Sequence, residues 1–208
     1  ATDACSAVTW THNFNAVATQ ALCSSGGSLS VTFTATDACG NAVQTTAEIC
    51  ILVSPAIGLA KRTVQVINRP DGASDVTFEF NVENFGNVPL NDVQLTDNLA
   101  MAFAPCGAPA VLSLTSDDFT VNPAFNGNGN NNLLIGTDDL PVAAKGAVLL
   151  TIRVPPCSTV QFFNTATVTS TSPGGANITD VSQNGSDPAP DSVIDVNPGD
   201  NSVPTPVN

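Results

Sequence analysis

The sequence is poor in positive charge, in histidine and in aromatic residues other than phenylalanine. Its 208 residues include five lysines and arginines, one histidine, one tryptophan and no tyrosine, against 18 aspartates and glutamates. Nucleic acids and anionic lipids are bound through Lys and Arg, so a net charge of −13 excludes both as partners. No segment approaches the ~20 apolar residues of a membrane-spanning helix, and we expect no direct membrane insertion. No signal peptide stands at Ala1, which predicts a mature or excised segment of a longer protein.

Catalytic patterns are equally scarce, and we predict that the protein is not an enzyme. The one histidine, His12, has no partner pattern, and the G-x-S-x-G pattern of serine hydrolases does not occur. The paired aspartates of the chain lack the Tyr and Trp residues that line a sugar-cleaving cleft. The single tryptophan, Trp10, is predicted to lie in the core instead of forming a sugar platform.

The residues that are abundant indicate a folded all-β protein. Apolar residues make up 42% of the chain and charged residues 11%, the reverse of a disordered composition. Valine and threonine, which are frequent, fit the pleated surface of a strand better than a helix. Fifteen glycines and fifteen prolines supply the turns that many short strands require.

The apolar pattern divides the chain into three parts, 1–54, 55–182 and 183–208. In the first part, residues 28–36 alternate in polarity and precede a turn and a second run at 43–53, as in a β-hairpin. About three strands are too few for a free-standing sandwich, so we expect disulfides, a neighbouring module or another chain to complete it. The second part has successive strand-length runs and predicts a β-sandwich. The third, rich in Asp and Pro, is predicted to be extended, as a donor strand or a linker between modules.

Six cysteines favour disulfides over a metal site, because their spacings are long and histidine is nearly absent. If the two sandwich parts are separate domains, Cys106–Cys157 is the only pairing open to the second. The four cysteines of the first part allow three connectivities: Cys5, Cys23, Cys39 and Cys50. Disulfides place the chain in an oxidising compartment, which predicts an extracellular location.

Several segments carry a resemblance to known repeats. The runs ATDACSAVTW and SVTFTATDACGN resemble the HYR-like repeats of giant surface proteins of Bacteroidetes, which are immunoglobulin-like and occur in tandem. Residues 57–208 resemble the conserved-repeat domain of bacterial surface proteins (domain of unknown function 11), in LAKRTV, VTFEFNVENFGNVPLNDVQLTDNL, FNTATVTSTSPGG and DNSVPTPV. The resemblance implies two immunoglobulin-like β-sandwich modules in tandem, followed by an extended C-terminal segment. It also implies a place in surface stalks, adhesin shafts or filaments at the bacterial cell surface.

Three polar residues fall on strand faces that otherwise look inward: Lys61, Asp97 and Asn164. Some bacterial surface domains join a Lys of their first strand to an Asn of their last strand, promoted by a buried carboxyl group. Burial lowers the pKa of a lysine and makes its amine nucleophilic, and a neutral acid can polarise the amide. The pattern therefore makes an intramolecular isopeptide bond a candidate site. The favoured interpretation is that these residues lie near solvent at strand ends or hydrogen-bond only.

The second candidate is a calcium-binding site. Calcium is the one cofactor for which the sequence offers ligands. Aspartates recur along the C-terminal part, and oxygen ligands from loops suit Ca²⁺: Asp180, Asp187, Asp191, Asp195 and Asp200. None of these runs matches the EF-hand loop or the calcium-binding nonapeptide repeat, and a solvated acidic tail is the favoured interpretation.

Candidate modification sites also lie in the C-terminal part. Asn177-Ile178-Thr179 and Asn184-Gly185-Ser186 match the acceptor pattern for N-glycosylation. Asp191-Ser192-Val193 resembles the short O-glycosylation motif of Bacteroidetes, which makes Ser192 the preferred candidate for a source of that phylum.

These observations predict a structural segment of an extracellular surface fibre, filament or adhesin stalk. Its partners would be neighbouring modules or copies of itself, which cover exposed sheet edges by strand addition. The alternative is an adhesin module that binds a ligand or glycan through loops such as 126–132 and 137–141. Aromatic anchors are scarce outside the expected strands, which favours the structural role.

Overall fold

The computed structural model describes residues 7–15, 26–158, 161–188 and 203–207, and their regular structure is almost entirely β-strand. The all-β prediction is therefore confirmed. The chain forms two compact units, Ala1–Val53 and Ser54–Asn208. Among the described residues, no helix has the length and hydrophobicity needed to cross a membrane. The tandem immunoglobulin-like arrangement stays a prediction.

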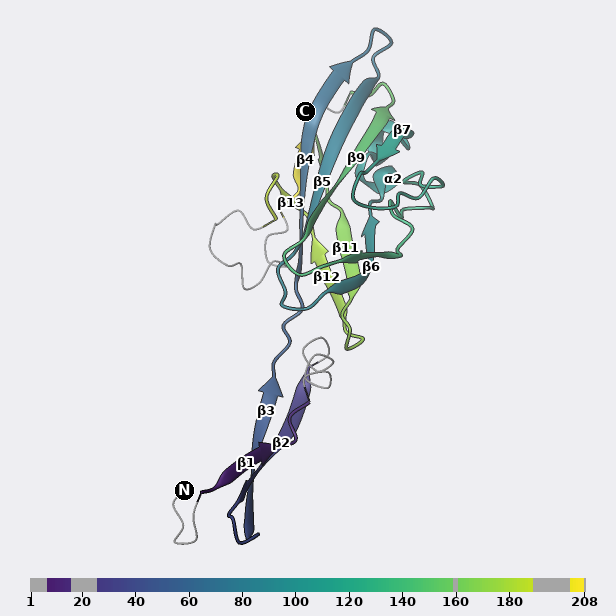
Figure 1. The fold of residues 1–208 in the computed structure, drawn as a ribbon. Helices are drawn as coiled ribbons and strands as arrows, with labels where there is room; N and C mark the ends of the chain where they lie inside the picture. Colours follow the sequence, from purple (N-terminus) through teal and green to yellow (C-terminus); the bar gives the residue numbers. More distant parts are fainter. Residues whose placement is uncertain (1–6, 16–25, 159–160, 189–202, 208) are drawn as a thin grey trace. The chain divides into compact units, whose positions relative to one another are not determined.

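The first unit is one antiparallel sheet of three strands in the order β1-β2-β3 (Figure 1). These strands are β1 (Thr9–His12), β2 (Gly27–Thr36) and β3 (Ala42–Ile51). The turn between β2 and β3 is closed by Asp37, whose Oδ1 accepts hydrogen bonds from the amides of Cys39 and Asn41 at 2.9 and 2.8 Å. An aspartate at this position stabilises the turn because its carboxylate satisfies amides that the ladder leaves unpaired.

Apolar residues of the first unit gather on one face of the sheet, and most of them are partly exposed. Val31 and Ala35 on β2 are buried, whereas Trp10 is 60% exposed and Val43 is 68% exposed. The prediction that Trp10 lies in the core is wrong. Its strand, β1, is at the edge of the sheet, and its neighbour across the ladder is Ala35, which is too small to cover an indole ring.

In its described residues, the second unit consists of two larger sheets and one short pair of strands. The first sheet has the order β13-β4-β5-β9-β7: β13 (Gln183–Asn184), β4 (Ile57–Asn68), β5 (Ser74–Asn84), β9 (Lys145–Val154) and β7 (Ala110–Thr115). The second has the order β12-β11-β6-β8: β12 (Asn177–Val181), β11 (Thr167–Thr171), β6 (Leu90–Thr96) and β8 (Asp138–Leu140). The short pair is β10 (Phe162–Asn164) with β14 (Thr205–Val207). The short helix α2 (Leu99–Ala102) and a 3₁₀ turn (Ala104–Cys106) follow β6.

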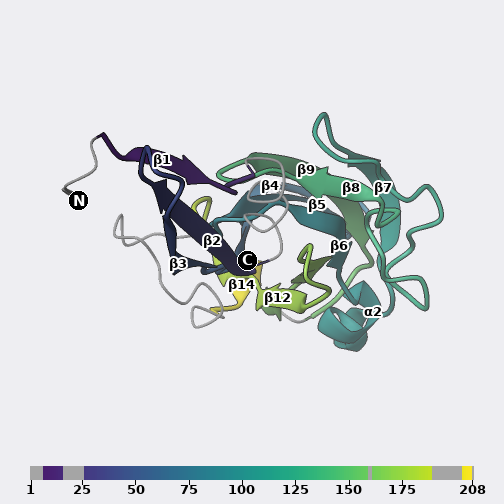
Figure 2. The same cartoon turned by 60° about the horizontal axis from the view of Figure 1, so that its bottom comes forward.

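The two larger sheets pack face to face around one hydrophobic core, and Figure 2 shows them as separate layers. Alternate residues of β5 point inward and are almost completely buried: Val76, Phe78, Phe80 and Val82. They meet Val93 and Leu95 of β6 and Val168 of β11 in the same cluster. Full burial of each such side chain contributes about 1.5–3 kcal/mol. The core thus fixes which face of each strand looks inward, and with it the position of the polar residues on those faces.

The described parts of the C-terminal segment, 183–188 and 203–207, belong to the second unit. Strand β13 pairs in parallel with β4, and β14 pairs antiparallel with β10. Gln183, Thr205 and Val207 are buried. The compact unit therefore continues beyond residue 182, the boundary after which the sequence predicts an extended segment.

Candidate functional site

Lys61 lies in the middle of β4 with its side chain in the core. It continues the inward face of Ile57 and Leu59, and its relative exposure is 0%. Directly opposite on β5 is Phe80, and the ammonium nitrogen lies 4.3 Å from the ring centre of Phe78 and 5.0 Å from that of Phe80. A lysine is almost never fully buried without a partner, so this position calls for a polar neighbour.

Asp97 supplies that neighbour from the opposite sheet. It follows the last residue of β6, and it continues the inward face of Val93 and Leu95. The hydrogen bond from its backbone amide to the carbonyl of Asn131, 2.9 Å, holds the chain as it leaves the strand. The carboxyl group is therefore anchored on the sheet that faces Lys61.

Asn164, the last residue of β10, brings its amide to the same carboxyl group. Lys61 Nζ lies 2.7 Å from Asp97 Oδ2, and Asn164 Nδ2 donates to the same oxygen at 3.1 Å. The exposures of Asp97 and Asn164 are 2% and 3%. The three residues predicted on inward faces thus form one cluster, in which Lys61 and Asn164 each contact Asp97. They come from β4, from the end of β6 and from β10, which lie in three different sheets.

The electrostatics of the cluster favour uncharged groups. Burial lowers the pKa of Lys61 below that of a free lysine, although the charge and hydrogen bond of Asp97 oppose the shift. Burial likewise raises the pKa of Asp97, opposed by the charge of Lys61 and by hydrogen bonds from Lys61 and Asn164. Asp97 Oδ1 is buried and accepts no hydrogen bond from a described residue. A buried carboxylate oxygen without a donor is costly, so the proton is best placed on this carboxyl group.

This arrangement has the parts needed for an amide-forming reaction. A neutral Lys61 amine can attack Cγ of Asn164, forming an Nζ–Cγ bond and breaking the Cγ–Nδ2 bond. Asp97 can take the proton that the attacking nitrogen loses and give one to the leaving nitrogen, which departs as ammonia. The reaction needs neither oxidant nor reductant.

Sequence reasoning missed three neighbours of this cluster. The rings of Phe78 and Phe80 lie against the amine of Lys61. The alternation of β5 predicts that both rings point to the inward face of the sheet, which is also the face of Lys61. The third is Thr205, which is fully buried and lies opposite Asn164 in the β10–β14 pair. No local pattern identifies Thr205, because its pairing joins segments about 40 residues apart in sequence.

Cys106 and Cys157 form a disulfide with a Cα–Cα distance of 5.2 Å. It ties the 3₁₀ turn after α2 to the segment that follows β9. In the first unit, Cys5, Cys23 and the side chain of Cys50 lie outside the described residues, and Cys39 is exposed in the β2–β3 turn. The connectivity of that unit therefore stays open.

Two of the candidate calcium ligands, Asp180 and Asp187, lie within the described residues. Asp180 is buried, and its Oδ2 accepts the backbone amide of Leu59 at 2.7 Å. Asp187 is exposed beside a pocket, and the remaining candidates lie outside the described residues: Asp191, Asp195 and Asp200. Among the residues that the structure describes, no three His, Cys, Asp or Glu side chains are placed to hold a metal ion.

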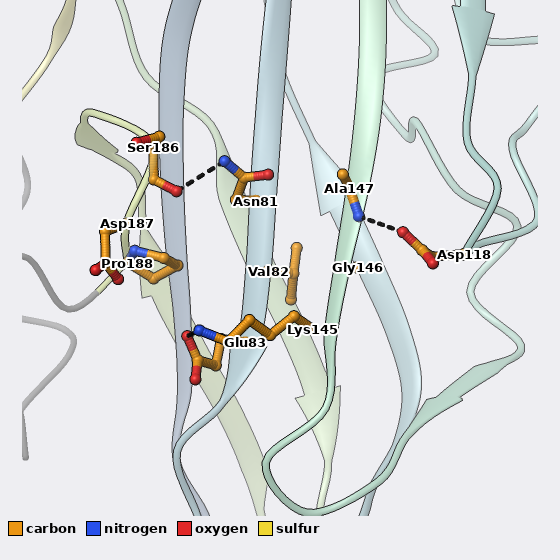
Figure 3. Close-up of a pocket in the computed structure, with 10 residues that line it drawn as sticks. All are labelled: Asn81, Val82, Glu83, Asp118, Lys145, Gly146, Ala147, Ser186, Asp187 and Pro188. Carbon is orange, nitrogen blue, oxygen red and sulfur yellow. Dashed lines mark hydrogen bonds and ion pairs between the residues drawn. The ribbon is translucent and has the colours of Figure 1, made fainter.

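The pocket that contains Asp187 has a volume of about 410 Å³ and is drawn in Figure 3. Lys145 reaches across it to Glu83 at 2.8 Å, and that hydrogen bond, together with the charges of Glu83 and Asp187, raises the pKa of Lys145. Asn81 donates to the carbonyl of Ser186 at 2.8 Å. Lys145 pairs with Glu83, and Asp118 accepts the backbone amide of Ala147 at 2.8 Å, so these two carboxylates already have partners within the protein.

The candidate glycosylation sites and the candidate binding loop lie at the surface where they are described. Asn177 and Asn184 are exposed, on β12 and β13, and Ser192 lies outside the described residues. Loop 126–132 uses its amides internally: the side chain of Asn126 accepts from the amides of Asn128 and Asn130 at 2.8 and 3.1 Å. This leaves fewer loop amides to recognise a ligand.

No protein-family model matches the chain, and no curated protein matches it either. Similar solved structures include the C-terminal domain of the Streptococcus agalactiae AgI/II polypeptide BspA, with 13% identity, 76% of this chain covered and a TM-score of 0.29. The C-terminal domain of the Streptococcus pyogenes antigen I/II-family protein AspA has 10% identity, 76% coverage and a TM-score of 0.28. The chain spans 59% and 55% of these two structures. Likeness at this level does not establish a shared function, and the resemblances to HYR-like and conserved-repeat domains stay predictions.

Proposed function

We propose that this chain is a structural segment of a bacterial extracellular surface fibre, filament or adhesin stalk. Its second unit is stapled by an isopeptide bond between Lys61 and Asn164, in addition to the Cys106–Cys157 disulfide. The observation that carries the proposal is the buried contact of Lys61 and Asn164 with one oxygen of Asp97, at 2.7 and 3.1 Å.

The position of the cluster favours a structural role over catalysis on a substrate. Lys61 and Asn164 belong to different sheets, so a bond between them would join β4 covalently to the β10–β14 pair. All three residues are fully or almost fully buried, which leaves no room for an external substrate. A reaction that consumes the protein's own side chains occurs once and leaves a permanent cross-link.

The first unit supports association with neighbouring modules or further copies in the fibre. It has a three-stranded sheet whose apolar face is incompletely covered, with Trp10, Val43 and Ile49 at 60%, 68% and 38% exposure. Sheets of this kind are stable when a second layer or an added strand covers them. Electron microscopy of native surface material tests this part: regular fibres with this chain as the repeating unit support it, and dispersed particles contradict it.

Intact mass spectrometry of the fully reduced and denatured protein tests the cross-link. The expected mass is lower than that of the sequence by one ammonia, and peptide fragmentation should place the link between Lys61 and Asn164. The Lys61→Met and Asn164→Ala variants should have the full mass of their sequences. An unshifted wild-type mass refutes the isopeptide bond.

A further inference from the structure

We propose that the C-terminal strand β14 licenses the isopeptide bond: Lys61 and Asn164 react only when residues 205–207 are seated beside β10. This inference rests on the cross-link of the proposed function and adds the element that controls it. Strand β14 contacts both of the strands that carry the reacting residues.

Thr205 of β14 is the direct neighbour of Asn164. In the antiparallel β10–β14 pair, Asn164 is opposite Thr205 and Phe162 is opposite Val207. Residues opposite each other in such a pair point to the same face, with their Cβ atoms about 5 Å apart. Thr205 has 0% exposure and Asn164 has 3%, so the threonine covers the reacting amide on the side of β14.

The same strand also holds the backbone of Lys61. The hydroxyl of Thr205 donates to the carbonyl oxygen of Lys61 at 2.8 Å, and the hydroxyl of Thr63 donates to the carbonyl oxygen of Pro206 at 2.9 Å. Strands β4 and β10 are not paired with each other in any described ladder. Strand β14 therefore joins the two strands that carry the reacting side chains and sets their separation.

Val207 anchors the strand in the core. It is 5% exposed and belongs to the hydrophobic cluster, opposite Phe162, whose ring lies 5.0 Å from that of Phe103. By contrast, Val203 is 60% exposed. Val207 thus holds the segment in the core, while Val203 at the other end lies in solvent and offers a matched control position.

Removing β14 would admit water to the cluster from its side. A solvated lysine has a pKa near 10.4 and is neutral in only about one molecule in 10³ at pH 7. The ammonium form has no lone pair, so it can neither form the Nζ–Cγ bond nor release ammonia from Asn164. The loss of the bridge between β4 and β10 would also relax the alignment of amine and amide, which lowers the rate further.

The test uses the full chain with Val207→Asp, which places a charge in the seat and expels the strand, and with Val203→Asp as the matched control. The fraction of molecules that have lost ammonia is measured by intact mass in freshly purified protein. Wild type and Val203→Asp should be fully reacted, and Val207→Asp should remain largely unreacted while keeping its far-UV circular dichroism and its disulfide. A synthetic peptide with the sequence of residues 203–208, added to Val207→Asp, should restore the mass loss over time.

The outcomes separate the two proposals. A folded Val207→Asp protein that is fully reacted overturns the role of β14 and leaves the cross-link intact, whereas an unreacted wild type overturns the cross-link itself. If Val207→Asp does not fold, the double variant Thr63→Val/Thr205→Val replaces it. That variant removes both side-chain hydrogen bonds between β14 and β4 with little change in volume. Slower mass loss than in wild type, followed from synthesis, supports the proposal, and an unchanged rate overturns it.

Discussion

The cross-link predicts a large and specific loss of stability when Asn164 is replaced by alanine. A bond between Lys61 and Asn164 closes a loop of roughly 100 residues, and the chain-entropy relation for such a loop gives about 4.7 kcal/mol of stabilisation. The free energy of unfolding should therefore fall by about 4.7 kcal/mol in the reduced protein.

The disulfide should reduce the effect of Asn164→Ala on the free energy of unfolding. Cys106 and Cys157 lie inside the segment between Lys61 and Asn164, so with the disulfide formed the unfolded chain between these two residues is effectively shortened by about half. Halving a loop lowers its closure entropy by about 0.6 kcal/mol. The effect of Asn164→Ala should thus be smaller in the oxidised protein than in the reduced one by about that amount.

A double-mutant cycle distinguishes a covalent bond from hydrogen bonds alone. Lys61→Met and Asn164→Ala would each remove the same bond, so the double variant should cost little more than either single variant. The interaction energy should then exceed the ~0.5–3 kcal/mol that contacting residues usually show. Guanidinium unfolding should be followed by far-UV circular dichroism, because the single tryptophan lies in the first unit and the chain has no tyrosine. Single-variant effects that add to within about 0.5 kcal/mol would refute the cross-link.

Three further predictions follow from the second unit. Asp97→Asn keeps the shape of the cluster but removes the acid, so its mass should stay that of its sequence; loss of ammonia in this variant would contradict the role of the carboxyl group. Reduction of Cys106–Cys157, which spans 51 residues, should lower the free energy of unfolding by about 4 kcal/mol, and an unchanged melting temperature would contradict this. Hydrogen bonds from Arg153 and Arg69 hold the pKa of Asp75 far below its usual range. The stability that Asp75 contributes is therefore present above the pKa of an unfolded aspartate, near 4, and is lost as pH falls below it. Denaturation curves should show a steeper acid loss in wild type than in Asp75→Asn, and equal slopes would contradict the assignment.

The alternation of strand residues was enough to predict the members of the candidate site. Because side chains on a strand alternate between faces, Lys61, Asp97 and Asn164 could each be assigned to the inward face from their apolar neighbours. When two sheets pack around one core, polar side chains that point inward are buried and need hydrogen-bond partners, which other inward polar side chains can supply. Their contact needed the structure, because which strands face each other depends on pairing between distant segments.

The misassigned and missing elements have physical causes. A large aromatic residue is usually buried, which predicts Trp10 in the core, but its edge position and small neighbour leave it exposed. Strand β14 could be suggested only as a donor strand, since its composition does not reveal which strand accepts it. Three residues make too short a run for periodicity to identify Thr205 and Val207 as inward-facing.

The location of the cross-link has a consequence for how the second unit would respond to a pulling force. Tension applied through residues before Lys61 and after Asn164 would pass through the proposed bond between them, so the chain from β5 to β9 would lie outside the path of the force. An extended chain of roughly 100 residues is about 350 Å long at ~3.5 Å per residue. That contour length would be withheld from extension, and only the parts of the second unit outside the cross-linked loop, residues 54–60 and 165–208, would be free to extend.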